Sequence, residues 1–88
     1  MWTVYIKRKL ERKIAALPEH VQDIFEDLKV DLMLNGPQQP EWMNYSKLGP
    51  NKYHCHLNYN YVACWQVEAD NTLIVEVYYV GSRENAPY

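Results

Sequence analysis

The hydrophobic pattern of this chain changes period once, from helical spacing before residue 36 to a period of two from residue 53 on. Before the change, apolar residues recur three or four positions apart and form the stripe of an amphipathic helix, Val21, Ile24, Phe25, Leu28 and Leu32. After the change, alternate residues share one face of a strand. This order of patterns predicts an α+β domain rather than an all-helical or all-β one.

Two helices are expected before the strands. A first apolar stripe lies within residues 7–17 and consists of Leu10, Ile14 and Leu17. Pro18 suits the first turn of the second helix, where its missing N–H is not needed. Asn35-Gly36-Pro37 is typical of a helix end, because glycine adopts left-handed backbone angles and proline cannot continue the helix. The two helices therefore form a helical hairpin.

Four strands are expected from β-branched and aromatic runs, at residues 2–6, 53–57, 61–68 and 73–80. Residues 36–51 contain three prolines and two glycines and are predicted to be a loop. Asp70-Asn71 suits a tight hairpin turn, and Gly81 is expected to end the last strand.

Short connections favour an antiparallel meander of the three late strands, with the first strand beside them. The helical hairpin then covers one face of this four-stranded, mostly antiparallel sheet. The expected architecture is a two-layer β-α-α-β-β-β fold in a single domain, residues 1–88.

Composition narrows the class of protein. The chain has 88 residues, 48% of them hydrophobic, and a net charge of −2, which is ordinary for one folded domain. It has no apolar run of the roughly 18 residues that cross a bilayer, and its N-terminal charges follow the apolar run, the reverse of a secretory signal. We expect a cytoplasmic protein with no membrane partner. Cys55 and Cys64 are expected to be free, buried thiols.

A cluster of positive charge occupies the predicted first helix. Five of the nine basic residues fall within seven positions, namely Lys7, Arg8, Lys9, Arg12 and Lys13. Such a cluster can bind RNA phosphates, or an acidic segment of a partner protein, or it can simply be the solvated face of a helix.

Three segments carry a resemblance to a known family: YHCHL (53–57), YVACWQV (61–67) and LIVEVYYVGSRENAPY (73–88). They resemble the RelE/ParE superfamily of toxins from type II toxin–antitoxin systems, with the RelE-like branch favoured. The resemblance implies the RelE-like microbial RNase fold and a cognate antitoxin as partner. RelE-like members inhibit translation by cutting mRNA on the ribosome, without a cofactor. ParE-like members bind DNA gyrase and have no nuclease activity.

The resemblance also implies roles for individual residues. Arg83 falls on the arginine of the V-G-x-R motif, which RelE-like toxins place at the scissile phosphate. Tyr88 falls near their C-terminal tyrosine. His54 and His56 occupy two strand positions that are lysines in the best-known RelE toxins. Val62 replaces the arginine that usually follows a tyrosine on the next strand.

These residue types suit metal-independent RNA cleavage, which needs a base, an acid and a cation at the phosphate. His54 and His56, two apart on a strand, stand about 7 Å apart at Cα, and either can move a proton at neutral pH. Arg83 can hold phosphate oxygens through two N–H groups, and Tyr88 or Tyr61 can stack on a base.

Three alternatives remain at the sequence level. The histidine pair can be part of a solvated sheet face. His-x-His can also supply two zinc ligands, but tetrahedral zinc needs two more, and no metal site is expected. The first interpretation is a RelE-like, ribosome-dependent nuclease, and the missing arginine at Val62 supports the alternatives of a gyrase-binding toxin or a degenerate inactive member of the fold.

Overall fold

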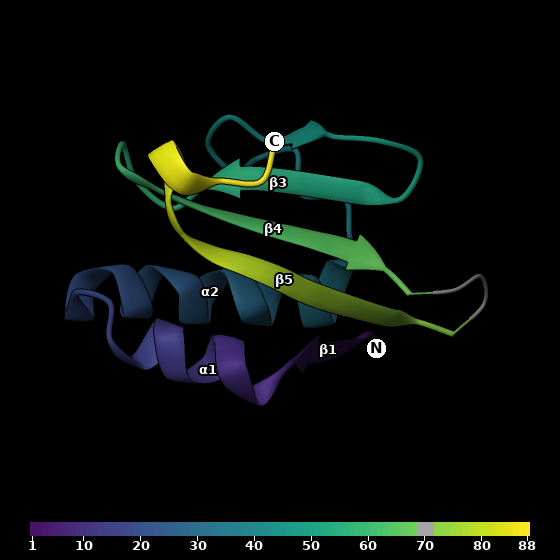
Figure 1. Ribbon diagram of the computed structural model, residues 1–88. Helices are drawn as coiled ribbons and strands as arrows, with labels where there is room; N and C mark the ends of the chain where they lie inside the picture. The colour runs from purple at the N-terminus through teal and green to yellow at the C-terminus, as the bar shows by residue number, and fades with distance from the viewer. Residues whose placement is uncertain (69–71) are drawn as a thin grey trace.

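The computed structural model describes residues 1–68 and 72–88. Its elements follow in the order β1 (Thr3–Ile6), α1 (Arg8–Ala15), α2 (Glu19–Asn35), β2 (Ser46–Lys47), β3 (Lys52–His56), β4 (Tyr61–Val67), β5 (Ile74–Ser82) and the short 3-10 helix η1 (Arg83–Asn85). Figure 1 shows α1 and α2 side by side against the sheet, while the C-terminal segment turns back toward β3. The expected two-layer α+β architecture is confirmed.

The sheet has the strand order β1-β5-β4-β3-β2. Strands β3, β4 and β5 form the expected antiparallel meander, and β1 joins β5 in parallel. The prediction of four strands is wrong by one, because Ser46 and Lys47 in the predicted loop pair with His54 and Tyr53 as β2. A two-residue strand is too short to show alternation, so no sequence pattern reveals it.

The end of β5 also differs from the prediction. Gly81 pairs with Val62, and the strand continues through Ser82, which pairs with Tyr61. Gly81 does not end the strand, because Val80 and Ser82 on either side of it also stay paired with β4. The predicted Asp70-Asn71 turn lies outside the described residues.

One hydrophobic core lies between the helices and the sheet. Its largest side chain is Trp65, which is fully buried, and α2 contributes four buried residues, Val21, Phe25, Leu28 and Leu32. Both cysteines are free and fully buried, as predicted. No helix of residues 1–68 and 72–88 is long and apolar enough to cross a membrane.

The sheet has a second face on the side opposite this core, which we call the open face. It carries the strand side chains that point away from the helices. Its central rows are Lys52, Gln66 and Glu76, then His54, Cys64 and Tyr79, then His56, Val62 and Gly81. Residues directly opposite each other in an antiparallel pair share a face, so register alone assembles these rows.

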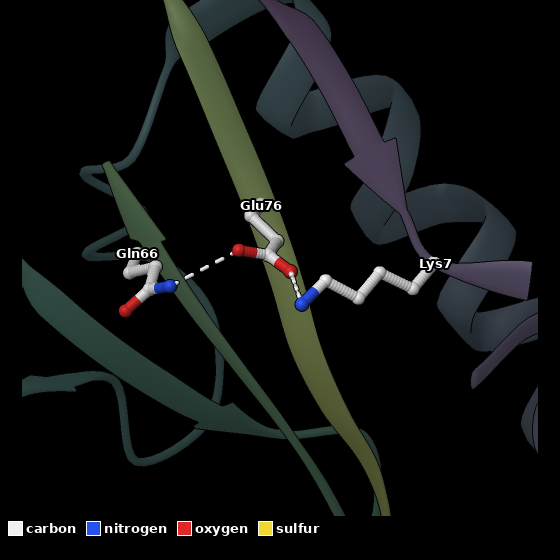
Figure 2. A network of polar contacts seen from close by, with 3 residues as sticks. All are labelled: Lys7, Gln66 and Glu76. Carbon is white, nitrogen blue, oxygen red and sulfur yellow. Dashed lines mark hydrogen bonds and ion pairs between the residues drawn. The ribbon is translucent and has the colours of Figure 1, made fainter. Parts of the chain in front are cut away.

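A polar network at one end of the open face ties α1 to the sheet. Figure 2 shows the Lys7 side chain reaching from the start of α1 to Glu76 on β5, with Nζ 3.8 Å from Oε2. On the other side, Gln66 Nε2 donates to Glu76 Oε1 at 3.1 Å. A hydrogen bond with Glu68, a second with Gln66 and the positive charge of Lys7 together hold the pKa of Glu76 below its ordinary value, although burial opposes them.

Helix α2 ends at Gly36, as the sequence predicts, and the structure adds a second reason for glycine there. Gly36 has φ of 81°, which disfavours other residues. A Cβ atom at this position would lie 2.6 Å from the Trp2 side chain. The glycine therefore lets the N-terminal segment pack directly on the helix end.

Gly36→Ala is expected to lower the free energy of unfolding by about 2 kcal/mol or more, since it combines an unfavourable φ with a steric clash. Gly49→Ala is the matched control, because nothing lies within 4 Å of a Cβ at Gly49. That variant is expected to stay within about 0.5 kcal/mol of wild type. Urea unfolding followed by circular dichroism measures both, and equal losses would contradict the explanation.

Candidate nucleic-acid interface

The two predicted catalytic histidines lie next to each other on the open face. His54 and His56 have ring centroids 5.8 Å apart, and the ring of Tyr88 lies 4.5 Å from that of His54. Tyr88 is 56% exposed, whereas His54 is only 8% exposed. The C-terminal residue thus folds back over β3, and the reading of His54 as part of a solvated sheet face is wrong.

The loop strand β2 fixes the orientation of His54. Ser46 pairs with His54 in the ladder, and its Oγ lies 3.0 Å from His54 Nδ1. His56 is half-buried and lines a cavity of about 690 Å³ between the end of α2 and residues 38–43. His54 is therefore shielded from solvent, whereas His56 is partly accessible to it.

Burial lowers the pKa of His54 below its ordinary value, and the charge of His56 lowers it further. A hydrogen bond with the Ser46 backbone opposes this shift in part. The lowered pKa favours the neutral form of His54, and a neutral imidazole can accept a proton.

Because the pKa of His54 is lowered in the folded protein, the free energy of unfolding is expected to depend on pH. Below the ordinary histidine pKa of 6.5, the unfolded chain binds a proton at this residue more readily than the folded protein does. The contribution of His54 to stability is therefore present above pH 6.5 and is lost as pH falls toward the native-state pKa. His54→Asn should lose less stability between pH 7.5 and pH 5 than wild type, in urea unfolding at each pH. His20→Asn, at an exposed position on α2, should follow wild type.

An irregularity in β5 brings a tyrosine to the histidines. Cys64 pairs with Tyr79 but Trp65 pairs with Val77, so the register between β4 and β5 skips Tyr78. This β-bulge leaves Val77 and Val80 both in the core and turns Tyr79 to the row of His54. Strict alternation along β5 would put Tyr79 in the core with Val77. The sequence pattern therefore does not predict that Tyr79 lies beside the histidines.

Gly81 leaves room for the Tyr79 ring. A Cβ at Gly81 would lie 2.9 Å from Tyr79 Oη, which donates to the Ser82 carbonyl at 2.7 Å. The glycine of the V-G-x-R segment thus allows Tyr79 to lie along the open face, directly before Arg83.

Arg83 lies at the same end of the sheet as His56, since the ladder runs from the pair Val62–Gly81 to Tyr61–Ser82 and then to η1. Its guanidinium carbon sits 4.5 Å from the centre of the Tyr59 ring. Its charge opposes the rise in the pKa of Tyr88 that burial causes. The structure therefore gathers His54, His56 and Tyr88, while Arg83 stands beside them and faces Tyr59.

The basic cluster is exposed throughout and consists of Lys7, Arg8, Lys9, Arg12 and Lys13. A cavity of about 270 Å³ between α1 and β5 is lined by all three lysines of the cluster together with Tyr78 and Tyr79. Because Tyr79 also borders the row of His54, the basic cluster and the histidine pair are connected along one surface. Lys7 is the member of the cluster that forms the ion pair with Glu76.

Tyr61, predicted to stack on a base, is half-buried and lines a further cavity of about 430 Å³ with Arg83. Within residues 1–68 and 72–88, no three His, Cys, Asp or Glu side chains gather closely enough to hold a metal ion.

No model of a known protein family matches the sequence, and no curated protein matches it. Solved structures do match. The isolated RelE toxin of E. coli has a TM-score of 0.74 at 18% identity, over 99% of this chain and 89% of that one. A chain of the RelE–RelB complex from Pyrococcus horikoshii has a TM-score of 0.74 at 14% identity, over 97% and 98%. A chain of the YoeB–YefM complex from Staphylococcus aureus has a TM-score of 0.68 at 9% identity, over 91% and 94%.

These likenesses span nearly the whole chain, and they define the class of structure. The protein has the fold of the RelE-type toxins, as the resemblance in its C-terminal half implied.

Proposed function

We propose that this protein is the toxin of a type II toxin–antitoxin system and cuts mRNA on the ribosome. One observation carries the proposal most directly. His54, whose pKa burial lowers, lies against both His56 and Tyr88 on the open face of a RelE-type fold. Two groups able to move protons and one aromatic ring thus meet at the positions that the family resemblance marks.

In the proposed reaction, neutral His54 removes the proton from a ribose 2′-OH, and the 2′ oxygen attacks the adjacent phosphorus. His56 protonates the 5′ oxygen as the P–O5′ bond breaks, which leaves a 2′,3′-cyclic phosphate and a 5′-hydroxyl. Arg83 stabilises the negative charge of the phosphorane. Tyr88 moves off His54 and stacks on a base, a motion open to it because its side chain is largely exposed.

The basic cluster supplies the affinity for RNA in this proposal. Its exposed lysines and arginines face solvent beside two tyrosines, a combination suited to phosphate contacts with interleaved stacking. Binding through several phosphates weakens steeply as salt rises.

A protein antitoxin is the expected partner, and the cytoplasm the expected location. The solved RelE–RelB and YoeB–YefM complexes support such a partner for this fold. The antitoxin would keep the toxin inactive by covering part of the surface described above.

Primer extension on an mRNA in purified translating ribosomes tests the activity. Wild-type protein is expected to produce cuts that require the ribosome, and a variant with His54, His56 and Arg83 all changed to alanine should produce none. Folded, antitoxin-free protein that leaves the mRNA intact would overturn the nuclease proposal.

One observation favours a second candidate, a toxin that binds DNA gyrase without nuclease chemistry. Val62 is fully buried on the open face between His56 and Gly81, where RelE-like members carry an arginine. The site therefore has one cation fewer for a phosphate. Arrest of DNA replication before protein synthesis on induction would support gyrase as the target, and harmless overexpression would indicate an inactive member of the fold.

A further inference from the structure

The turn between β3 and β4 is held by several hydrogen bonds, one of which joins it to η1. Asn58 Oδ1 accepts hydrogen bonds from the backbone N–H groups of Asn60 and Tyr61, at 2.8 and 3.0 Å. Leu57 N–H donates to the Tyr61 carbonyl at 2.8 Å, and Arg83 N–H donates to the Asn60 carbonyl at 2.9 Å. These hydrogen bonds hold the residue at the tip of the turn in a defined position relative to Arg83.

The turn presents Tyr59, which is 71% exposed and is not part of the core. The contact that the structure gives its ring is the Arg83 guanidinium, with Cζ 4.5 Å from the ring centre. A guanidinium over an exposed ring contributes only about 0.5–1 kcal/mol, so stability alone gives little reason for a large aromatic residue at this tip.

Tyr59 and Arg83 line a cavity of about 430 Å³ together with Asn60, Tyr61, Ser82 and Glu84. This volume is within the ordinary range of small-ligand sites. It combines two phenol rings, one cation and hydrogen-bonding groups, which is the chemistry that holds one nucleotide by base stacking and a phosphate contact. Glu84 is the one anion in the lining, and it would weaken phosphate binding.

We infer that this cavity is a binding subsite for one nucleotide of single-stranded RNA next to the scissile phosphate. Tyr59 stacks on the base of this nucleotide, while Arg83 binds the scissile phosphate beside it, as in the proposed reaction. In the free protein the Tyr59 ring holds Arg83 at the cavity, and RNA replaces the guanidinium on that ring. The inference rests on the proposed function in that RNA is the ligand, and it adds a specific role for Tyr59.

The test measures the affinity of the free protein for the single-stranded RNA tetraadenylate at low salt. Shifts in the NMR signals of the tyrosine rings and of the Arg83 Nε–H group report the binding. Tyr59→Leu is expected to weaken binding about tenfold, because stacking on an aromatic ring is lost. Tyr59→Phe should stay within about twofold, since the ring and not the hydroxyl stacks. Glu84→Gln should bind more tightly.

Tyr5→Leu, at an exposed tyrosine on β1, is the matched control and should bind like wild type. Unchanged affinity in Tyr59→Leu would overturn the subsite, as would equal losses in Tyr59→Leu and Tyr59→Phe. In the ribosome assay, Tyr59→Leu should raise the apparent KM and leave kcat nearly unchanged. Wild-type protein that binds RNA through Tyr59 but cuts no mRNA would refute the proposed function and leave the subsite standing.

Discussion

Arg83→Ala is expected to slow ribosome-dependent cleavage by about 100- to 1000-fold, the usual effect of removing one donor that stabilises the charge of a transition state. The effect should be large because Val62 stands where RelE-like toxins carry a second arginine, and the proposed reaction assigns the charge of the phosphorane to Arg83. Arg83→Lys should recover only part of the rate, since lysine keeps the charge but loses the two parallel N–H bonds.

Single-turnover cleavage at saturating protein measures this loss separately from binding. Arg12→Ala in the exposed basic cluster is the comparison, and it should weaken binding and reduce its salt dependence without a comparable loss of rate. Because Arg83 is exposed, its variants should unfold within about 1 kcal/mol of wild type. Similar cleavage rates for Arg83→Ala and wild type would exclude Arg83 from the reaction.

Trp65→Ala is expected to lower the free energy of unfolding by about 3–5 kcal/mol, through the cavity it leaves in the core. A domain of this size is stable by roughly 4–13 kcal/mol, so the variant retains little margin. Trp65 is fully buried, stacks near Tyr45 and Tyr53 at 6.3 Å between ring centres, and donates its Nε1–H to the Pro37 carbonyl at 2.9 Å.

Trp65→Phe separates the hydrogen bond from the packing. It should cost about 1–3 kcal/mol, because it leaves the Pro37 carbonyl without its partner and a smaller void behind. Met43→Ala, at an exposed position of the same loop, is the control and should be nearly neutral. Urea unfolding measures all three, and a Trp65→Ala loss below 1 kcal/mol would contradict this account of the core.

The same contact has a consequence for the site. Residues 36–45 lead to Ser46, which contacts His54, and the Pro37 bond ties the start of this segment to β4. Trp65→Phe should therefore also alter the surroundings of His54, visible as a shift of its imidazole NMR signals.

The sequence by itself determined the elements that have a period. Helix α2, its end at Gly36 and the strands β3 and β4 all follow from local patterns, and each is confirmed. Pairing of the late strands followed from their short connections. His54 and His56 could be placed on one face together, because a strand fixes side-chain direction at every second residue.

Only the tertiary structure decided what surrounds those residues. The strand β2 is too short to show a periodic sequence pattern, yet it carries the Ser46 hydroxyl that contacts His54. The bulge at Tyr78 reversed the direction of Tyr79, and the tail placed Tyr88 over His54 from 34 positions away. Periodicity records which way a side chain points along its own element. Contacts between distant segments depend on register and on how the chain turns back, and these are set by the packing of the whole domain.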